Sequence, residues 1–230
     1  MEVFPNILQN DFMVRQVPLR FGEIYHVFNK SIAGYKIFNN RSDYKRFILI
    51  LSYYNSSHKK IRLSDWLRSE NSVSVSSLLL PQEDQIVKFI AYHIMPTHYH
   101  IGIKVLEEKS IYHYLNNIGN SYTRYFNTKV GRKGPLWQSP YKAVRVTSDE
   151  QLLHLSRYIH LNATTAGLVE NPEDWEYSSY REYIENPKIL REIMTEISVK
   201  DPKRYKKFVE NNKDYQKKLQ TIKKPHRGGA

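Results

Sequence analysis

The 230-residue chain is predicted to fold as an α+β protein, a split βαβ sandwich of the ferredoxin-like kind with one added helix. Three observations predict it. Strand and helix patterns alternate in the order β-α-β-β-α-β-α. The second and third strands are separated only by Pro96-Thr97, so they are expected to be antiparallel neighbours. The length suits one sizeable domain with an appendage, and there are no internal repeats.

The first half of the chain begins with a strand. Residues 22–33 are rich in β-branched and aromatic side chains, which is typical of strands. Ser42 is expected to cap a helix that continues through Tyr54. Residues 56–84 are polar and serine-rich, and we interpret them as an insertion with a short helix around Asp65-Trp66-Leu67.

The second half supplies the remaining elements. Strands are predicted at Ile86–Met95, at 98–106 and at 137–146. A long helix is predicted between the last two, from Ser110 to the glycine at position 131. A final helix is expected at about 149–163.

The charge balance favours a polyanionic partner. The formal net charge is +12 with a pI of about 9.6, and the 18 tyrosines offer stacking surfaces for unpaired bases. The charge is uneven, because the chain from Lys188 onward carries 13 Lys/Arg against 5 Asp/Glu. A solvated helical tail is the alternative explanation for that segment.

Several classes of protein are disfavoured. Cysteine is absent, which excludes a disulfide scaffold and a thiolate metal site. No apolar run approaches the roughly 18 residues of a membrane span, and the first residues lack a signal-peptide pattern. We therefore expect a cytoplasmic protein without a membrane partner.

The most informative short motif is the pair His98 and His100 on the third strand. Alternate residues of a strand point to the same face, so the two imidazoles would project together. They could bind a divalent metal, or they could be two ordinary polar residues.

The last helix offers groups that would complete such a site. His154, Tyr158 and Asn162 are four residues apart and form one stripe beside the apolar face of the helix. Tyr158 could be a nucleophile and Asn162 a third metal ligand. The alternatives are a packing tyrosine, a C-cap asparagine and a surface histidine.

Together these groups form a coherent chemistry. A phenol with a pKa near 10 is a poor nucleophile at neutral pH. A divalent ion bound by two imidazoles and an oxygen can polarise a phosphodiester and neutralise developing charge. Attack would leave a covalent 5′-phosphotyrosine that a later 3′-hydroxyl can reverse.

Motifs in this sequence resemble those of a known family. Residues 95–101 are similar to the His-hydrophobic-His motif of the single-tyrosine HUH (IS200-like) transposases. Residues 158–162 and 166–169 resemble the catalytic helix of their REP-associated tyrosine transposase branch. Three further segments resemble that branch and occur in the same order along the chain, at residues 25–30, 134–142 and 175–180. Together, the resemblance spans roughly residues 20–184.

The resemblance implies an HUH nuclease fold and a function. The domain would be residues 1–184. The family core does not account for the polar insertion at about 56–84 or for the basic tail at 185–230, which we expect to be helical and then disordered. The implied activity is a Mg²⁺- or Mn²⁺-dependent nickase and strand transferase of single-stranded DNA. His98 and His100 would be metal ligands, Asn162 would complete the metal site and Tyr158 would be the nucleophile.

The family also implies partners. Its members act on hairpins formed by imperfect palindromes, so single-stranded DNA with such elements is the expected partner, and the protein would associate with the nucleoid. It could be a monomer or a homodimer.

Three positions depart from the family pattern. Ala163 follows Asn162 where relatives have Asn-Pro, Pro140 stands where an arginine is common, and Tyr99 is larger than the usual residue between the histidines. Tyr99 is expected to point to the opposite, core-facing side of the strand. The first two departures keep open a domesticated hairpin-binding protein without strand transfer. A metallohydrolase of small phosphates is a third possibility, which only the histidine pair supports.

Basic and aromatic residues outside the motif are expected to contact DNA. The turn before the fourth strand would contact phosphates, and the tail would hold a hairpin stem by its backbone. Trp137 could stack on a base or anchor the strand. The basic residues are Lys129, Arg132, Lys133 and Lys142 in and after the turn, and Lys203, Arg204, Lys206 and Lys207 in the tail.

Overall fold

A four-stranded antiparallel sheet forms the centre of the protein, in the strand order β2-β3-β1-β4. This is the order of a split βαβ sandwich and confirms the predicted α+β fold class. The computed structural model describes residues 18–57, 63–69, 78–79, 84–186, 188, 196–198 and 201–212, so most of the expected insertion and the end of the tail lie outside it. The strands are β1 (Ile24–Lys30), β2 (Val87–Met95), β3 (His98–Val105) and β4 (Lys142–Val146).

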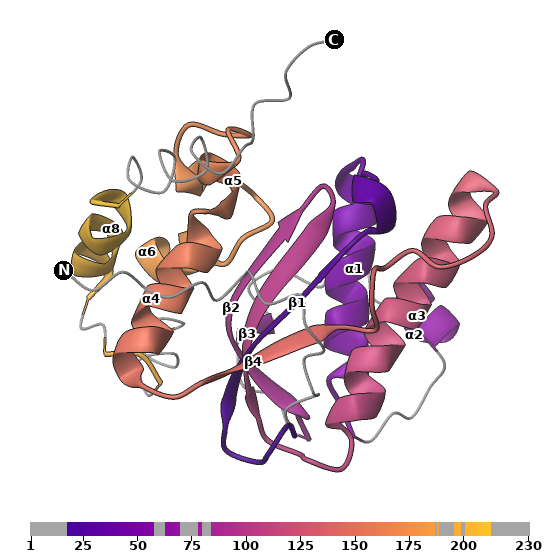
Figure 1. Ribbon diagram of the computed structural model, residues 1–230, viewed down its shortest axis with the longest axis horizontal. Coiled ribbons are helices and arrows are strands. Elements are labelled where there is room, and N and C mark those ends of the chain that lie inside the picture. Colours follow the sequence, from indigo (N-terminus) through magenta and orange to yellow (C-terminus); the bar gives the residue numbers. More distant parts are fainter. Residues whose placement is uncertain are drawn as a thin grey trace, which may run out of the picture.

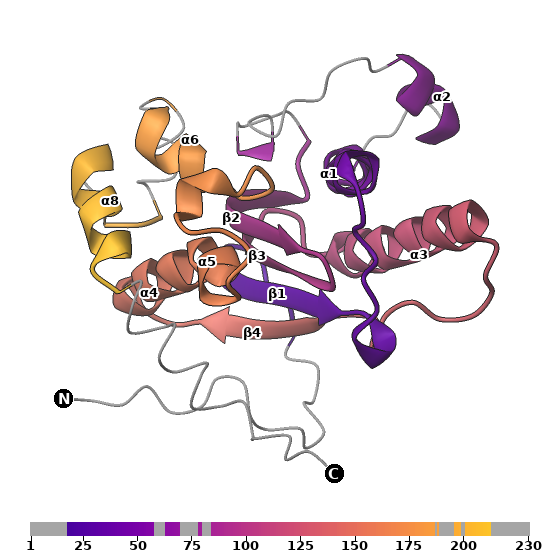
Figure 2. The same ribbon diagram turned by 90° about the horizontal axis from the view of Figure 1, so that it is seen from above.

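Helices cover both faces of the sheet. Figures 1 and 2 show α1 and α3 on one side, and α4, α5, α6 and α8 on the other. The α-helices are α1 (Arg41–Tyr54), α2 (Leu63–Ser69), α3 (Ile111–Val130), α4 (Asp149–His160), α5 (Asn162–Thr165), α6 (Tyr180–Glu185) and α8 (Pro202–Glu210). Two short 3-10 turns lie at Ile32–Gly34 and Pro172–Asp174.

Strand alternation separates the side chains of β3 between these two layers. Tyr99 is 2% exposed, and its ring contacts Phe47 of α1 and Trp137 at centroid distances of 5.0 and 5.5 Å. The expectation that Tyr99 faces the core is therefore confirmed. Gly102 lies on the opposite face, where the Cδ1 atom of Ile159 in α4 approaches within 3.8 Å of the position that a Cβ would take. His98 and His100 share that α4 face by the same alternation.

The outer edge of β2 is covered by the chain before α6. Ile94 N donates to Tyr177 O, and Ser179 N donates to Tyr92 O. The Trp175 indole also donates to Ile94 O. These bonds satisfy backbone groups that an open edge strand would leave unpaired.

Two predicted boundaries differ from the structure. Asn40 caps α1, because its side chain accepts from the amides of Ser42 and Asp43, two residues before the expected cap. β4 begins at Lys142, not at 137. Before β4, Trp137 forms one isolated β-bridge with Ser31, the residue that follows β1. Pro140 has no N–H to donate to a neighbouring strand.

The last helix predicted from the sequence is interrupted. α4 ends at His160, and the separate α5 begins at Asn162, where a continuous helix to 163 was expected. The Leu161 amide bonds back to the carbonyls of both Arg157 and Ile159, which tightens this turn.

The described part of the tail packs against the domain. Tyr205 and Val209 of α8 are fully buried, beside α4 and α6. Among the helices that the structure describes, none is long and apolar enough to cross a membrane.

Candidate active site

His98 and His100 project side by side from β3, as the alternation predicts. Their ring centroids are 5.1 Å apart, and the rings are nearly perpendicular, at 88°. His100 is 2% exposed, whereas His98 is half-buried. Phe28 of β1 lies directly opposite His100 in the antiparallel ladder, and Lys30 lies opposite His98.

The Nδ1 atom of each histidine already has a partner. His98 Nδ1 lies 2.8 Å from Thr97 Oγ1. His100 Nδ1 lies 2.9 Å from Nε2 of His26, a β1 residue that is 3% exposed. A metal-binding histidine usually bonds to a protein group through one ring nitrogen and to the metal through the other. The arrangement therefore leaves Nε2 of His98 and of His100 for a ligand.

Burial keeps both imidazoles neutral. Burial, together with the positive charge of Lys30, lowers the pKa of His98 to about 4. Burial also holds the pKa of His100 well below its usual 6.5, helped by the neighbouring histidines. Both rings are consequently in the form that binds metal at neutral pH.

Helix α4 carries Tyr158 to this pair. The helix starts where the Ser148 side chain accepts from Gln151 N. The Tyr158 ring then lies edge-on to His100 and to His26, at centroid distances of 5.4 and 6.0 Å. The fold thus brings together a phenol and two imidazoles from distant parts of the chain.

The Tyr158 hydroxyl is protonated at neutral pH. Burial raises the pKa of Tyr158 to about 12, and a hydrogen bond with the Asn162 side chain opposes that shift. A nucleophilic role for this phenol therefore requires that its proton leave during attack.

Asn162 begins α5, directly after the interruption of the helix. It is 9% exposed, and its Nδ2 donates to the Tyr158 carbonyl at 2.8 Å and to the Ile159 carbonyl at 3.4 Å. Because the nitrogen is used in this way, Oδ1 is the atom that remains for a metal.

The donor set fits a divalent ion. Within the described residues no three His, Cys, Asp or Glu side chains are grouped to hold a metal. A metal ion held here would need a ligand of another kind beside the two imidazoles, and the amide oxygen of Asn162 is the candidate. Mixed imidazole and oxygen ligands suit ions such as Mn²⁺, and Mg²⁺ prefers oxygen.

Sequence reasoning missed His26 as part of this cluster. A lone histidine on a strand carries no signal by itself. The β1–β3 register places His26 opposite Gly102, diagonal to His100, and that register cannot be read from the sequence. His154 of the predicted stripe lies elsewhere, 5.7 Å from the ring of Phe208 in α8.

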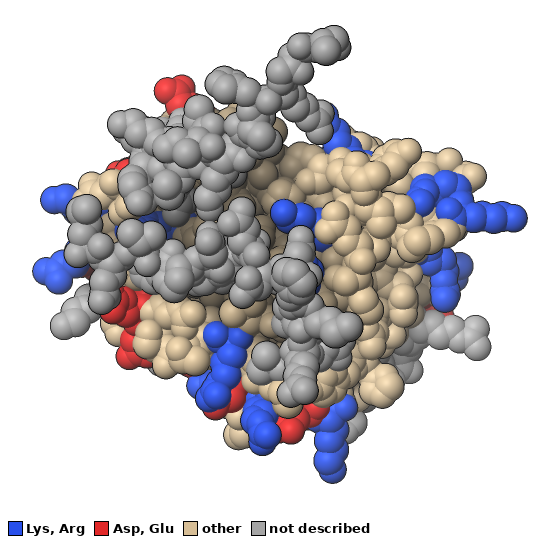
Figure 3. Space-filling view, in the orientation of Figure 1, with Lys and Arg blue, Asp and Glu red and all other residues tan. Residues whose placement is uncertain are grey.

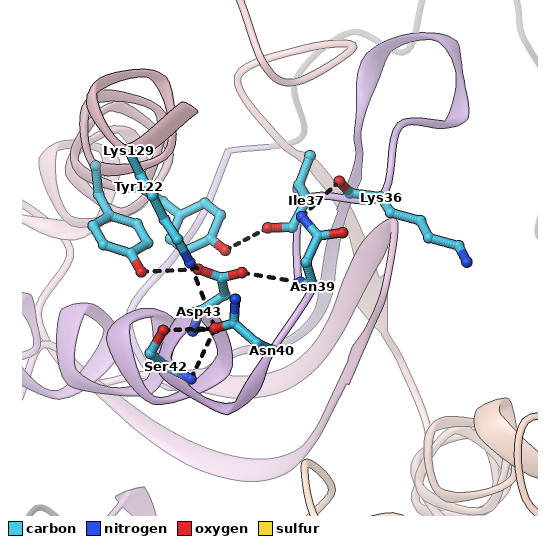
Figure 4. A network of polar contacts seen from close by, with 9 residues as sticks. Lys36, Ile37, Asn39, Asn40, Ser42, Asp43, Tyr122 and Lys129 are labelled. Carbon is cyan, nitrogen blue, oxygen red and sulfur yellow. Dashed lines mark hydrogen bonds and ion pairs between the residues drawn. The ribbon is translucent and has the colours of Figure 1, made fainter. Parts of the chain in front are cut away.

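Lys129 has a partner inside the fold. Its Nζ lies 2.5 Å from Oδ1 of Asp43, a carboxylate that also accepts from the Tyr125 hydroxyl and from Asn39 N (Figure 4). Burial alone would raise the pKa of Asp43, but Lys129 and these hydrogen bonds hold it below its usual value. Lys129, which was expected to contact a DNA phosphate, thus forms an ion pair that joins α3 to α1.

The other predicted DNA-contact residues vary in their surroundings. Arg132 donates to Asn127 Oδ1 and to Pro135 O, and so shapes its turn. Trp137 is 9% exposed, with its indole N–H donating to Gly119 O, so it packs in the core. Lys133 and Lys142 are exposed.

The predicted residues of the tail lie on α8. Lys206 pairs with Glu173 and Glu210, and Arg204 pairs with Asp201. Lys203 and Lys207 are exposed. Among the described residues on the face shown in Figure 3, Lys and Arg side chains are scattered and do not form one patch.

Comparison with known proteins finds a family model that matches the segment carrying the motif. The family model for IS200-like transposases matches residues 78–162, a range that contains His98, His100, Tyr158 and Asn162. No curated protein matches the chain. The resemblance to this family is thereby confirmed over the segment that carries the candidate site.

A solved structure shares the fold. A REP-associated tyrosine transposase bound to a REP hairpin is similar to the chain, with a TM-score of 0.51 and 13% sequence identity. The alignment covers 76% of this chain and 87% of that one. At this identity the similarity establishes the architecture, which agrees with the strand order described above.

Proposed function

We propose that the protein is a metal-dependent endonuclease and strand transferase of single-stranded DNA, acting at hairpin-associated sites through a 5′-phosphotyrosine at Tyr158. The observation that carries this proposal is the edge-on contact of the Tyr158 ring with His100, which sets a phenol beside a pair of neutral imidazoles. The match to the IS200-like transposases over residues 78–162 supports it.

The proposed reaction exchanges one phosphodiester bond for another. The Tyr158 oxygen attacks the phosphorus, the bond from phosphorus to the 3′ oxygen breaks, and the phenolic proton is transferred to the departing 3′-hydroxyl. Attack by a 3′-hydroxyl reverses the step, so strands can be rejoined without ATP. A divalent ion bound to His98, His100 and Asn162 would neutralise charge on the phosphate oxygens.

The residues of this chain then have distinct roles. His98 and His100 would hold the ion through Nε2, because their Nδ1 atoms are bonded to Thr97 and His26. Asn162 would contribute Oδ1, while its Nδ2 donates to the Tyr158 carbonyl near the end of α4. Tyr158 contacts His100 of the same chain, and on this ground we propose that the tyrosine acts in cis, in a monomer or a homodimer.

The proposed substrate is a single strand that carries a hairpin. The solved neighbour is bound to such an element, and the net charge of +12 favours a polyanion. Exposed lysines at Lys133, Lys142, Lys203 and Lys207 are our candidates for phosphate contacts. With DNA as substrate, we place the protein in the cytoplasm at the nucleoid.

The test is formation of a covalent adduct. A pool of end-labelled single strands with random hairpins is incubated with Mn²⁺ or Mg²⁺, and protein-linked DNA is measured under denaturing conditions. We expect an adduct with the parent and with the control Tyr53→Phe, which alters a tyrosine of α1, and none with Tyr158→Phe. An equal yield from Tyr158→Phe would show that the nucleophile is misassigned.

A second candidate function is hairpin binding without strand transfer. The observation in its favour is that burial raises the pKa of Tyr158 to about 12, which makes the phenol harder to ionise. Ala163 and Pro140 also depart from the family pattern. This candidate function predicts that the protein binds the hairpin in a binding assay but forms no covalent adduct with either Mn²⁺ or Mg²⁺. Detection of nicking would exclude it.

A further inference from the structure

His26 and His100 form a buried pair between adjacent strands. Nε2 of His26 and Nδ1 of His100 are 2.9 Å apart, and the two residues are 3% and 2% exposed. Their ring planes are nearly parallel, at 24°, and the centroids are 5.1 Å apart, so the rings meet edge to edge through these two nitrogens. Phe28 stacks on both rings, and Tyr158 lies edge-on to both.

Only one hydrogen can occupy this contact. A neutral imidazole carries a single N–H, so one ring donates and the other accepts. If His26 donates, His100 accepts through Nδ1, and its own proton sits on Nε2, where it blocks metal binding. If His100 donates from Nδ1, its Nε2 lone pair is free.

We propose that His26 is a positioning residue that accepts the Nδ1–H of His100, fixing the ring and the tautomer in which His100 Nε2 can bind a metal ion. The inference rests on the proposed metal-binding role of His100. His26 is itself no ligand in this arrangement, because its Nε2 is directed at Nδ1 of His100. Thr97 Oγ1 lies at the corresponding position beside Nδ1 of His98, at 2.8 Å.

The alternative is that the two histidines are merely packed together. Packing requires the shape of the His26 ring but no acceptor at its Nε2. His26→Leu removes the acceptor and keeps an apolar side chain of similar size, whereas His26→Gln keeps an amide oxygen near the position of Nε2. Phe28→Leu is the matched control, since Phe28 stacks on both rings without a hydrogen bond to either.

Two measurements test the proposal. Long-range ¹H–¹⁵N NMR of the metal-free parent reports which nitrogen of His100 is protonated, and we expect Nδ1. Titration with Mn²⁺ followed by EPR gives the metal affinity. We expect His26→Leu to weaken it by roughly 10- to 100-fold, with His26→Gln and Phe28→Leu within a few-fold of the parent.

The outcomes separate cleanly. A proton on Nε2 of His100, or an unchanged Mn²⁺ affinity in folded His26→Leu, overturns the proposal. Equal losses in His26→Leu and Phe28→Leu, or in His26→Leu and His26→Gln, also overturn it, because packing alone would then explain them. If the parent binds no Mn²⁺, the metal site of the proposed function fails and the role of His26 in metal binding fails with it. NMR of the metal-free parent and of His26→Leu still decides whether His26 sets the tautomer of His100, because the tautomer should change only when the acceptor is removed.

Discussion

The Tyr205 hydroxyl of α8 lies 2.6 Å from Nδ1 of His160, the last residue of α4 and the second after Tyr158. Both residues are fully buried. The same hydroxyl donates to Ser156 Oγ at 2.9 Å, and Nε2 of His160 lies 2.7 Å from Ser179 Oγ. The end of the helix that carries Tyr158 is thus fastened to α8 and to the segment along β2.

Tyr205→Phe is expected to destabilise the protein. The substitution keeps the ring but leaves His160 Nδ1 without its partner and removes the hydrogen bond that Ser156 Oγ accepts. A buried polar group without a partner costs about 1–3 kcal/mol. Chemical denaturation measures the change in the free energy of unfolding. Tyr35→Phe is the control, because the Tyr35 side chain is 63% exposed and should change stability little. Equal stability of Tyr205→Phe and parent would contradict the prediction.

Buried histidines are expected to make the protein acid-sensitive. Burial lowers the pKa of His26 and of His160 to about 3, from the ordinary 6.5. Between these values the unfolded chain binds protons that the folded protein does not. The contribution of these neutral histidines to the free energy of unfolding is therefore fully present above about pH 6.5. As the pH decreases below that value, the free energy of unfolding decreases by up to about 1.4 kcal/mol per pH unit for each histidine.

Denaturation curves between about pH 7 and pH 4 measure this slope. His160→Gln should reduce it by the contribution of about one proton, without changing its sign. A free energy of unfolding that is constant over the range, or one that rises on acidification, would contradict the assignment of neutral buried histidines.

The sequence predicted the parts of the site that depend on local periodicity. Alternation along a strand is enough to put His98 and His100 on one face and Tyr99 on the other, and helical spacing sets Tyr158 near Asn162. Contacts between strands could not be predicted in this way. His26 reaches His100 only through the register of β1 on β3.

Two further features needed the tertiary structure. Lys129 was predicted to contact DNA because the sequence showed no partner for its charge. Its partner, Asp43, is on a different helix and distant in sequence, so only the structure reveals the ion pair. The tail was expected to hold a hairpin stem, with a solvated helix as the alternative, because its charge dominates its composition. A signal was nevertheless present, since Tyr205, Phe208 and Val209 recur at helical spacing, and two of them are fully buried.

Lys129 and Lys133 are expected to respond differently to loss of charge. Lys129→Met removes the cation from Asp43, which is buried, and should destabilise the fold by about 2 kcal/mol. Lys133→Met should leave stability unchanged, because Lys133 is exposed, and should weaken hairpin binding with a smaller dependence on salt. Denaturation and binding at two salt concentrations distinguish them. The reverse pattern would show that Lys129 serves the DNA.

Tyr35 is expected to stack on an unpaired base near the site. It follows the turn at the end of β1, where Ser31 N donates to Thr97 O and the Ser31 hydroxyl donates to Tyr35 O, beside the start of the histidine strand. Its side chain is 63% exposed, whereas most tyrosines of the described core are buried. An exposed ring beside the exposed Lys36 suits a single strand, and such stacking contributes about 1–3 kcal/mol per base.

Tyr35→Ala should therefore weaken binding of a single strand by roughly tenfold or more, with little change in stability. Phe21→Ala is the matched control. Phe21 is 68% exposed but precedes β1 at the opposite end of the strand, where its amide donates to Glu108. Fluorescence anisotropy with a labelled strand gives both affinities. If Phe21→Ala weakens binding as much as Tyr35→Ala, any exposed aromatic ring has this effect, and the position of Tyr35 after β1 does not explain it.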